Sequence, residues 1–400
     1  MSSRRTTYQQ AITPNTLIDC ISQTEWRDSG KSHDEMTEAI QNCVGDLLNE
    51  GTYSFSIKAQ DDLFINAHNS HSIDALCQDL ILRKISKTIK QIYYIKPGNR
   101  NRIVKHIITL LNEKCDLWIL RLDVHHFYDT IDRGKILSDL KARGRLSAQT
   151  IMLLEKLFQT EEIRVSNGLP RGLNVSAMLS ELYMKYFDIE LKKQNGVYYY
   201  ARYVDDIIIF CTTKQAREEA YQRVVEELSK LSLTLNDEKT IFWDQTQAYP
   251  FIYLGYAFNK KGDTVTTTIA PEKLRKIKTR ITRSFVRFAK DGNYDDLLMR
   301  IKYLTGNFRL KQLNRILPIT VGLYYNYRYI NEYTCLTELQ MYYEKVLNVK
   351  RGKLGRQISR FLTKTQRKTL QKYNFVFGFR KRVRYSFNKD MLNKIRSCWR

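Results

Sequence analysis

Hydrophobic residues recur every three or four positions in several long stretches of the chain, a period that predicts amphipathic helices. The clearest stretches are residues 34–48, 72–92 and 215–231. In the first of them Met36, Ile40, Val44 and Leu47 form the stripe that we expect to face a core. The same period returns beyond Pro271, with Lys and Arg on the opposite face, so the C-terminal third is predicted to be predominantly helical.

Shorter runs of β-branched and aromatic residues favour strands elsewhere. Such runs occur at 117–120, 198–200 and 207–210, and residues 251–258 are typical of a hairpin. A strand, a turn at Pro97-Gly98-Asn99 and a second strand are predicted over Tyr93–Lys105. We also predict a short strand at Ile163–Val165, and helices at 136–158 and 176–191. The mixture indicates an α+β fold.

The charge balance indicates what the protein binds. The 400 residues carry a formal net charge of +24 and a sequence pI near 9.6. An excess of this size is typical of proteins that contact phosphate polymers. Acidic membranes would be the rival partner, but no apolar run approaches the roughly 20 residues of a spanning helix, and no secretion signal follows the first residues. Seven widely spaced cysteines without a CxxC pair fit a reducing cytoplasm.

The last fifty residues concentrate this charge, with sixteen Lys or Arg against the single acid Asp390. Six aromatic residues are interleaved with these cations: Tyr373, Phe375, Phe377, Phe379, Tyr385 and Phe387. Such a run can be merely a solvated surface. Cations interleaved with aromatic rings nevertheless favour nucleic-acid contact, through counterion release and base stacking.

Three carboxylates carry the candidate chemistry. Asp205 and Asp206 lie between two strand-forming runs, so we expect them at the tip of a hairpin. Asp123 follows another apolar run. Neighbouring carboxylates repel and are costly to bury unless a cation holds them together. Three of them at the ends of buried strands therefore predict a site for two hard divalent ions, the arrangement that supports in-line phosphoryl displacement.

Several segments occur in an order that resembles a known family. A basic segment near residue 100 precedes LDVHHFYD (122–129), GLPRG (168–172), YVDD (203–206), LTLNDEKT (233–240) and YLGY (253–256). Over roughly residues 90–260 this succession resembles the conserved core of reverse transcriptases. Each motif alone is weak, whereas the ordered set is specific. The resemblance implies a right-hand polymerase with fingers, an antiparallel-sheet palm and a helical thumb.

The same resemblance implies roles for individual residues. Asp123, Asp205 and Asp206 would be the catalytic carboxylates and, with the backbone of Val124, would hold two Mg²⁺ ions. Lys96, Arg102, Tyr128, Arg171, Gly172 and Lys239 would contact the incoming nucleotide, with Tyr128 beneath its sugar and Lys239 near the pyrophosphate. Tyr253, Leu254 and Gly255 would form the primer grip.

One departure from the family pattern bears on the subgroup. Many relatives carry Gln between the Pro and Gly of the GLPRG loop, where this chain has Arg171. No segment after residue 260 resembles a ribonuclease H domain. The sequence GLPRGLNVSAMLSELYM looks like the bacterial phage-defence group, which includes abortive-infection enzymes. We therefore expect a cytoplasmic RNA-directed DNA polymerase of antiviral defence that uses dNTPs, copies a cognate noncoding RNA and releases DNA.

Alternatives stay open at this point. A retron or group II intron-type enzyme, template-independent DNA synthesis by an abortive-infection enzyme, an RNA-templated RNA polymerase and a nucleic-acid-binding scaffold with a decayed polymerase core each fit part of the pattern. The expected domains are a helical lead-in (1–75), fingers and palm (76–260), a helical thumb (261–345) and a basic helical C-terminal extension (346–400).

Overall fold

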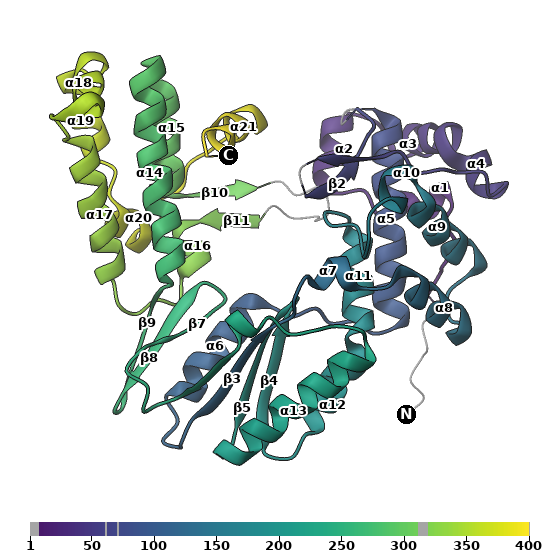
Figure 1. The fold of residues 1–400 in the computed structure, drawn as a ribbon. Helices are drawn as coiled ribbons and strands as arrows, with labels where there is room; N and C mark the ends of the chain where they lie inside the picture. The colour runs from purple at the N-terminus through teal and green to yellow at the C-terminus, as the bar shows by residue number, and fades with distance from the viewer. Residues whose placement is uncertain (1–7, 61, 70–71, 311–318, 400) are drawn as a thin grey trace. The chain divides into compact units, whose positions relative to one another are not determined.

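The computed structural model describes residues 8–60, 62–69, 72–310 and 319–399. These residues form a mixed α+β fold whose strand ladders are antiparallel (Figure 1). Within the described part, unit 1 comprises residues 8–100 and 116–244, and unit 2 comprises 101–115, 245–310 and 319–399. The α+β expectation is confirmed, while the four-domain division and the right-hand layout stay predictions.

Unit 1 is built around a four-stranded sheet in the order β4 (Val197–Tyr203), β5 (Asp206–Cys211), β3 (Trp118–Asp123) and β6 (Ile241–Asp244). The run Ile207–Cys211 is completely buried, and β5 lies between β4 and β3 in this sheet. Helices α12 (Lys185–Lys193) and α13 (Lys214–Lys230) pack against this sheet (Figure 1). Strands β4 and β5 pair antiparallel with Tyr203 opposite Asp206, which confirms the predicted hairpin around residues 203–206.

The other elements of unit 1 are mostly helices. They are α1 (Pro14–Ile18), α2 (Gln23–Ser29), α3 (His33–Ile40), the π-helical η1 (Gln41–Gly45), α4 (Asp46–Asn49), the hairpin β1 (Ile57–Gln60) and β2 (Leu63–Asn66), α5 (Ile73–Ile92), α7 (Phe127–Thr130), α8 (Arg133–Arg143), α9 (Ala148–Gln159), α10 (Glu161–Arg164), α11 (Asn174–Tyr183) and the 3₁₀ turn η2 (Asp237–Lys239). The predicted helices at 72–92 and 215–231 are confirmed to within a residue or two. Each starts at a capping hydroxyl, Ser72 and Thr213 respectively.

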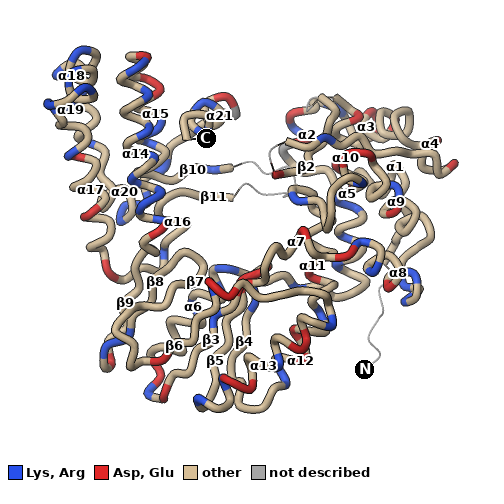
Figure 2. Tube along the Cα trace, viewed as in Figure 1, with Lys and Arg blue, Asp and Glu red and all other residues tan. Residues whose placement is uncertain are grey.

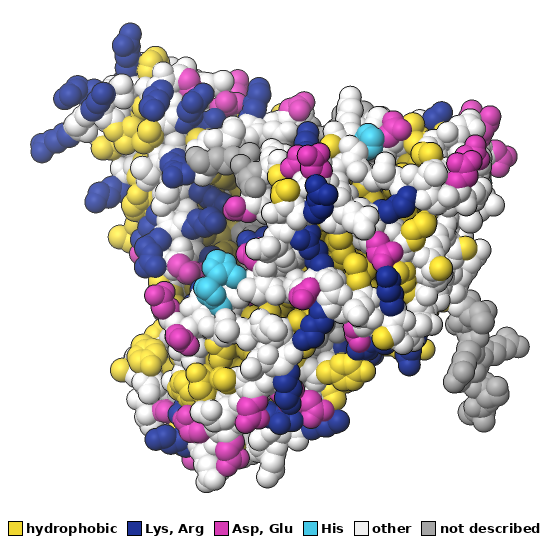
Figure 3. Space-filling view, turned by 45° about the vertical axis from the view of Figure 1, so that its right-hand side comes forward, with side chains coloured by type: hydrophobic (Ala, Val, Ile, Leu, Met, Phe, Trp, Pro, Cys, Tyr) yellow, Lys and Arg dark blue, Asp and Glu magenta, His cyan; other side chains and the backbone are white. Residues whose placement is uncertain are grey.

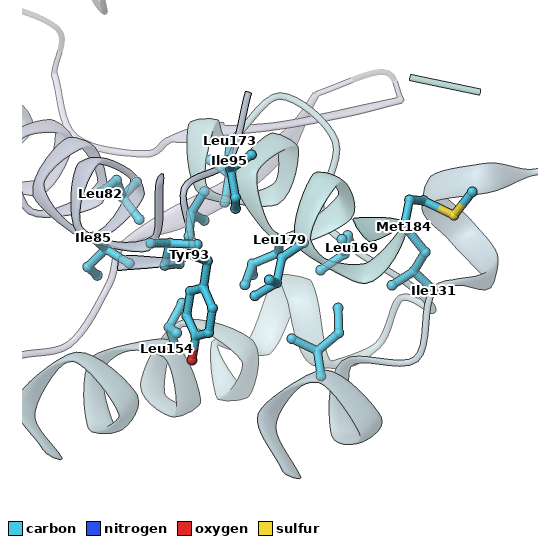
Figure 4. Close-up of a cluster of buried hydrophobic side chains, with 14 of the residues drawn as sticks. Leu82, Ile85, Tyr93, Ile95, Ile131, Leu154, Leu169, Leu173, Leu179 and Met184 are labelled. Carbon is cyan, nitrogen blue, oxygen red and sulfur yellow. The ribbon is translucent and has the colours of Figure 1, made fainter. Parts of the chain in front are cut away.

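Helix α5 supplies part of a continuous apolar core in unit 1. Figure 4 shows Leu82 and Ile85 of α5 beside Tyr93, with Leu154 of α9 and Leu179 of α11 in the same cluster. Burying one such Leu or Ile side chain stabilises the fold by about 1.5–3 kcal/mol. The core therefore fixes α11, and with it the loop that precedes α11, against the long helix α5.

Two strand predictions are wrong. Residues 93–105 do not form a strand, a turn and a strand, because α5 runs to Ile92 and α6 (Arg100–Leu111) begins directly after the Pro-Gly-Asn turn. The apolar positions Ile103, Val104, Ile107 and Leu111 are buried at helical spacing, and this period decides the conformation.

The second wrong strand is Ile163–Val165, where the structure has the helical turn α10. The carbonyl of Thr160 accepts the N–H groups of Ile163 and Arg164, and only Ile163 of the three predicted residues is buried. Three residues are too few for an alternating pattern to show itself. The helices predicted at 136–158 and 176–191 exist, but each is divided into two, namely α8 with α9 and α11 with α12.

One predicted core position is displaced by a π-helical turn. Met36, Ile40 and Val44 are buried as expected, whereas Leu47 is 42% exposed and Leu48 is buried instead. The wider turn η1 lies between α3 and α4. A π turn inserts one extra residue into the helical period, so every later position moves along by one.

Unit 2 combines a three-stranded meander with a helical assembly. Its elements are α6, β7 (Phe251–Tyr253), β8 (Tyr256–Lys261), β9 (Thr264–Ile269), α14 (Pro271–Asp291), α15 (Tyr294–Thr305), β10 (Asn307–Leu310), β11 (Ile319–Gly322), α16 (Leu323–Tyr327), α17 (Thr334–Leu347), α18 (Gly352–Phe361), α19 (Lys364–Gln371), α20 (Phe375–Arg380) and α21 (Lys389–Ser397). The helical character predicted beyond Pro271 is confirmed, with the hairpin β10–β11 as an unpredicted addition.

A buried asparagine joins three distant segments of unit 2. The side chain of Asn307 accepts the N–H of Tyr324 at 2.9 Å and donates to the carbonyl of Val383 at 3.0 Å. Its backbone N–H donates to Val383 and its carbonyl accepts the N–H of Tyr385. Val383 and Tyr385 are therefore bonded to Asn307 at the start of β10, and Asn307 is bonded in turn to the start of α16.

Positive charge is spread over the helices of unit 2. Lys and Arg recur along α14, α18 and α19 (Figure 2). The space-filling view shows their side chains projecting from this helical part of the surface (Figure 3). Within the described residues, no helix has the length and apolar character needed to cross a bilayer.

Candidate active site

The register of two strands brings the predicted carboxylates together. Asp123, the last residue of β3, lies directly opposite Asp206, the first residue of β5. Asp205 occupies the turn between β4 and β5, and its carbonyl accepts the N–H of Val124 at 3.1 Å. Residues more than eighty positions apart in sequence thus meet at one end of the sheet.

The hairpin turn that carries Asp205 has an unusual backbone. Tyr203 pairs with Asp206, so Val204 and Asp205 are the two turn residues, and Val204 has a φ of 62°. Two-residue hairpin turns of the primed types need a positive φ at their first central position, where a β-branched residue is strained. Such strain persists only where the surrounding structure holds the turn in place.

Arg202 provides that support. This buried side chain donates to both carboxylate oxygens of Asp188 at 2.8 Å and to Glu181 at 2.9 Å. It also donates to the carbonyl of Val204 at 2.9 Å, and Tyr200 donates its hydroxyl to Asp188 at 2.7 Å. A buried guanidinium with several charge-assisted hydrogen bonds is rigid, so the network fixes the turn against α11 and α12.

Two cations compensate the carboxylates. Lys239 donates to Asp123 at 2.8 Å, and Arg121 donates to Asp206 at 3.2 Å. Burial raises the pKa of Asp205 and of Asp206, and repulsion from the other carboxylates adds to both rises. The hydrogen bond to Asp123 raises the pKa of Lys239. The site therefore concentrates negative charge that an additional cation would stabilise.

The donor set fits Mg²⁺. The side chains of Asp123, Asp205 and Asp206 offer only oxygen atoms, which hard divalent cations prefer. Val124 forms an isolated bridge with Leu235 whose bonds use the carbonyl of Asp123 and the N–H of His125, not the carbonyl of Val124. In the described part of the chain no three His, Cys, Asp or Glu side chains form a ready-made metal cluster. In the structure, Lys239 and Arg121 donate to oxygen atoms of Asp123 and Asp206 that metal ions would otherwise take.

Tyr128 lies beside this site on α7, and its pKa is raised by burial and further by the charges of Glu181 and Asp205. Its backbone carbonyl accepts the N–H of Leu169 at 2.7 Å. A Cβ at Gly168 would lie 2.1 Å from that same oxygen, so only glycine permits the approach. The neighbouring Phe127 is buried. The 168–172 loop therefore lies directly against the segment that carries Tyr128.

Arg171 and Gly172 attach the same loop to two further elements. Arg171 donates to the carboxylate of Asp129 on α7, and its carbonyl accepts the N–H of Phe64 on β2 at 2.7 Å. Gly172 has a φ of 97°, and a Cβ there would lie 2.7 Å from the carbonyl of Phe64. Arg171 is thus paired with a carboxylate, an arrangement not anticipated for a predicted nucleotide ligand.

The remaining predicted residues are not brought to the carboxylates by the described contacts. Lys96 is an exposed side chain in the segment before α6, and Arg102 is an exposed side chain on α6 in unit 2. Tyr253, Leu254 and Gly255 belong to the β7–β8 hairpin of unit 2, where Leu254 and Gly255 form a turn with positive φ. Their nucleotide-binding and primer-grip roles stay predictions.

Sequence reasoning placed Lys239 at the site but missed Arg121 and the network of Arg202. Arg121 precedes Asp123 by two residues, and alternation along a strand places both on one face, so this partner could have been found. Arg202 adjoins the acidic turn, but its partners Glu181 and Asp188 lie on two separate helices. No local pattern announces a pairing of that kind.

Three carboxylates meet at the end of a buried sheet, and Arg202 holds the hairpin turn that carries Asp205 in place. Metal-dependent nucleotidyl transfer uses an arrangement of this kind. Residues 72–258 match the family model described as reverse transcriptase (RNA-dependent DNA polymerase). This part of the chain is therefore a reverse transcriptase domain, and the enzyme class that it implies is an RNA-directed DNA polymerase.

Two solved structures resemble the chain at a distance. The apo telomerase from Candida tropicalis truncated from its C-terminal domain shares 15% identity over 47% of this chain and 44% of its own, with a TM-score of 0.36. The telomerase from Candida albicans in complex with a TWJ fragment of telomeric RNA shares 12% identity over 83% of this chain and 59% of its own, with a TM-score of 0.37. The chain thus spans about half the length of these proteins. No curated protein matches it in sequence.

The raised pKa of Asp205 predicts a pH-dependent effect of Asp205→Asn in metal-free protein. A carboxyl whose folded pKa exceeds its unfolded value of about 3.9 stabilises the fold below that value and loses this contribution as pH rises through the folded pKa. We therefore expect Asp205→Asn to increase the free energy of unfolding relative to wild type at pH 7, and to have less effect at pH 4. Urea denaturation in EDTA at both pH values measures the difference.

Added Mg²⁺ should raise the free energy of unfolding less for Asp205→Asn than for wild type. A ligand that binds only the folded state stabilises it, and the variant lacks one of the carboxylates proposed to bind the metal. Asp237→Asn, which replaces an exposed carboxylate nearby, is the matched control. A larger gain from Asp205→Asn at pH 4 than at pH 7 would contradict the assignment of the destabilising charge.

The Arg171–Asp129 pair predicts coupled rather than independent effects. Arg171→Gln and Asp129→Asn should each raise the KM for dNTP, because each removes one of the contacts that hold the 168–172 loop against α7. The double variant should be little worse than either single one, with a coupling of about 0.2–1 kcal/mol, as expected for a partly exposed ion pair. Steady-state primer extension gives the four KM values. Strictly additive effects would show that the pair does not position the loop.

Proposed function

We propose that the protein is an RNA-directed DNA polymerase that copies a cognate noncoding RNA in bacterial antiviral defence. The observation that carries the polymerase part is the meeting of Asp123 with Asp205 and Asp206 at the end of the β3–β5 ladder. The matched reverse transcriptase domain, residues 72–258, contains all three carboxylates.

In this function Asp123, Asp205 and Asp206, with the backbone of Val124, hold two Mg²⁺ ions. When bound, these ions supply activation of the primer hydroxyl and stabilisation of the charge on the leaving pyrophosphate. Lys239 offers a cation beside the same carboxylates, where it can stabilise a phosphate or donate a proton. Tyr128 occupies the adjoining segment and would exclude a sugar that carries a 2′-hydroxyl.

The defence role rests on a narrower set of observations. The loop at 168–172 carries Arg171 where many reverse transcriptases have Gln, and the following segment is similar to that of phage-defence enzymes. The net charge of +24 supports a phosphate polymer as the partner. RNA template, dNTPs and DNA product are the partners that this function requires.

The ion pair between Arg171 and Asp129 favours a second candidate, DNA synthesis with little template guidance. Gln in this loop has both donor and acceptor atoms, whereas a guanidinium has only donors. An arginine that is bonded to Asp129 therefore presents a different surface to a template base. Under this candidate the chemistry at Asp123, Asp205 and Asp206 is unchanged and only the origin of the product sequence differs.

The polymerase proposal predicts Mg²⁺-dependent primer extension with dNTPs. Asp205→Asn combined with Asp206→Asn should lower the rate at least about a thousandfold, because metal-ion stabilisation of the transition state supplies several kcal/mol. Gel analysis of a labelled primer on an RNA template measures incorporation. Asp237→Asn is the control and should retain activity. Equal incorporation by wild type and the double variant would refute the assignment.

Nucleic acid that copurifies with the protein from its native host should distinguish templated from untemplated synthesis. We expect wild type to carry DNA complementary to one abundant noncoding RNA, and the Asp205→Asn variant to carry that RNA without the DNA. Sequencing both preparations provides the comparison. DNA of low complexity with no matching RNA would favour the second candidate, and DNA complementary to many cellular transcripts would contradict a cognate template.

A further inference from the structure

A hollow on unit 2 combines one exposed aromatic ring with three cations. It has a volume of about 870 Å³ and is lined by Lys372, Asn374, Val376, Phe377, Arg380 and Lys381. Phe377 is 56% exposed, so its ring is accessible to a ligand. We call these six residues the aromatic–basic hollow. None of them belongs to the matched polymerase segment, residues 72–258.

The fold holds this hollow in a fixed shape. Helix α20 buries Phe375 and Phe379 on its inner side, where it packs against α15, α16 and α17. A Cβ at Gly378 would lie 2.0 Å from the carbonyl of Thr305, so α20 touches α15 with its backbone. Asn374 accepts the N–H of Phe377 at 2.8 Å. The exposure of Phe377 is therefore imposed by a well-packed helix.

Helical spacing gathers the outer residues. Phe377 and Lys381 are four residues apart, as are Val376 and Arg380, and positions at this spacing are neighbours on a helix surface. Lys372, at the end of α19, adds a third cation to the same hollow. One exposed ring and three cations therefore line the same hollow.

The charge of the hollow is not neutralised by neighbouring acids. Across the part of the chain that the structure describes, no carboxylate forms an ion pair with Lys372, Arg380 or Lys381. Asp390 is the single acid among the last fifty residues. Like charges kept close together without counter-charges favour an anionic ligand.

We propose that the aromatic–basic hollow binds single-stranded nucleic acid, with a base stacked on Phe377 and the adjoining phosphates on Lys372, Arg380 and Lys381. Stacking on an exposed ring requires an unpaired base, whereas a duplex offers only its phosphates and groove edges. An acidic membrane would meet several exposed apolar side chains rather than one ring within a hollow. The partner class rests on the proposed function, because a polymerase of this kind handles single-stranded template.

The test compares binding of a labelled 20-nucleotide RNA of unstructured sequence to variants of the full chain by fluorescence anisotropy. Phe377→Ala should weaken binding about tenfold, and Phe377→Trp should restore it, because either ring can stack on a base. Replacing Lys372, Arg380 and Lys381 together by Ala should lower the slope of log affinity against log salt by about 2, since each phosphate contact releases counterions.

Matched controls separate this site from general basic character. Met341→Ala removes another exposed apolar side chain of unit 2, and Lys350→Ala/Arg351→Ala/Lys353→Ala removes the same charge from another exposed segment. Both controls should bind the strand more tightly than the corresponding hollow variants. Circular dichroism and thermal melting verify that each variant is folded.

Several results would overturn the proposal. Equal binding by Phe377→Ala and wild type, an equal effect of Phe377→Ala on a blunt duplex, or a Phe377-dependent attachment to phosphatidylserine vesicles or to a second copy of the chain would each do so. Inorganic polyphosphate that competes equally well against wild type and Phe377→Ala would show a charge effect without stacking. Primer extension by the same wild-type preparation is scored separately, so failure of the hollow and failure of the polymerase assignment are distinguishable.

Discussion

Electrostatic repulsion among Asp123, Asp205 and Asp206 is the constraint on which the site depends. A hydrophobic sheet would not by itself end in three carboxylates, because burial and mutual repulsion both disfavour their charged forms. Lys239 forms an ion pair with Asp123 and Arg121 forms one with Asp206, while Asp205 lies in the turn between β4 and β5. Burial, and then repulsion from the neighbouring carboxylates, still raises the pKa of Asp205 and of Asp206 beside these cations. A site with residual negative charge is suited to bind divalent cations.

The elements around the carboxylates convert that charge into a defined geometry. Arg202 ties the strained turn at Val204 to α11 and α12, and the 168–172 loop lies against α7 through Gly168 and Arg171. The apolar core in turn fixes α11 against α5. Each contact restricts one segment of the polymerase domain, so that groups from distant parts of the sequence keep their positions before any ligand arrives. Such preorganisation is what electrostatic catalysis requires.

The sequence was sufficient to predict those parts of the molecule that depend on local pattern. The helices at 72–92 and 215–231, the acidic hairpin and the meeting of Asp123 with Asp206 follow from periodicity and ordered motifs. The strands predicted at 93–105 and 163–165 failed where a turn signal or three apolar residues were given more weight than helical spacing. The exposure of Leu47 follows from a π turn, which no residue pattern signals.

Long-range polar partners were the other gap. The bonds of Arg202 to Glu181 and Asp188, and of Arg171 to Asp129, join residues between 14 and 42 positions apart. Their partners are decided by tertiary packing, so a single sequence leaves them undetermined. Arg171 is an example. The sequence marks it as unusual for its motif, but only the structure shows that it pairs with Asp129.

The bonding of Asn307 has a consequence for the basic end of the chain. Val383 and Tyr385 are bonded to Asn307, which also accepts the N–H of Tyr324 in α16, and the backbone of α20 lies against that of α15. The final fifty residues are thus an integral part of the fold of unit 2 rather than a detachable tail. Deleting them would expose the apolar surfaces that they cover and leave Asn307 without its acceptor, so truncation would report on the integrity of the unit before it reported on anything that this region recognises.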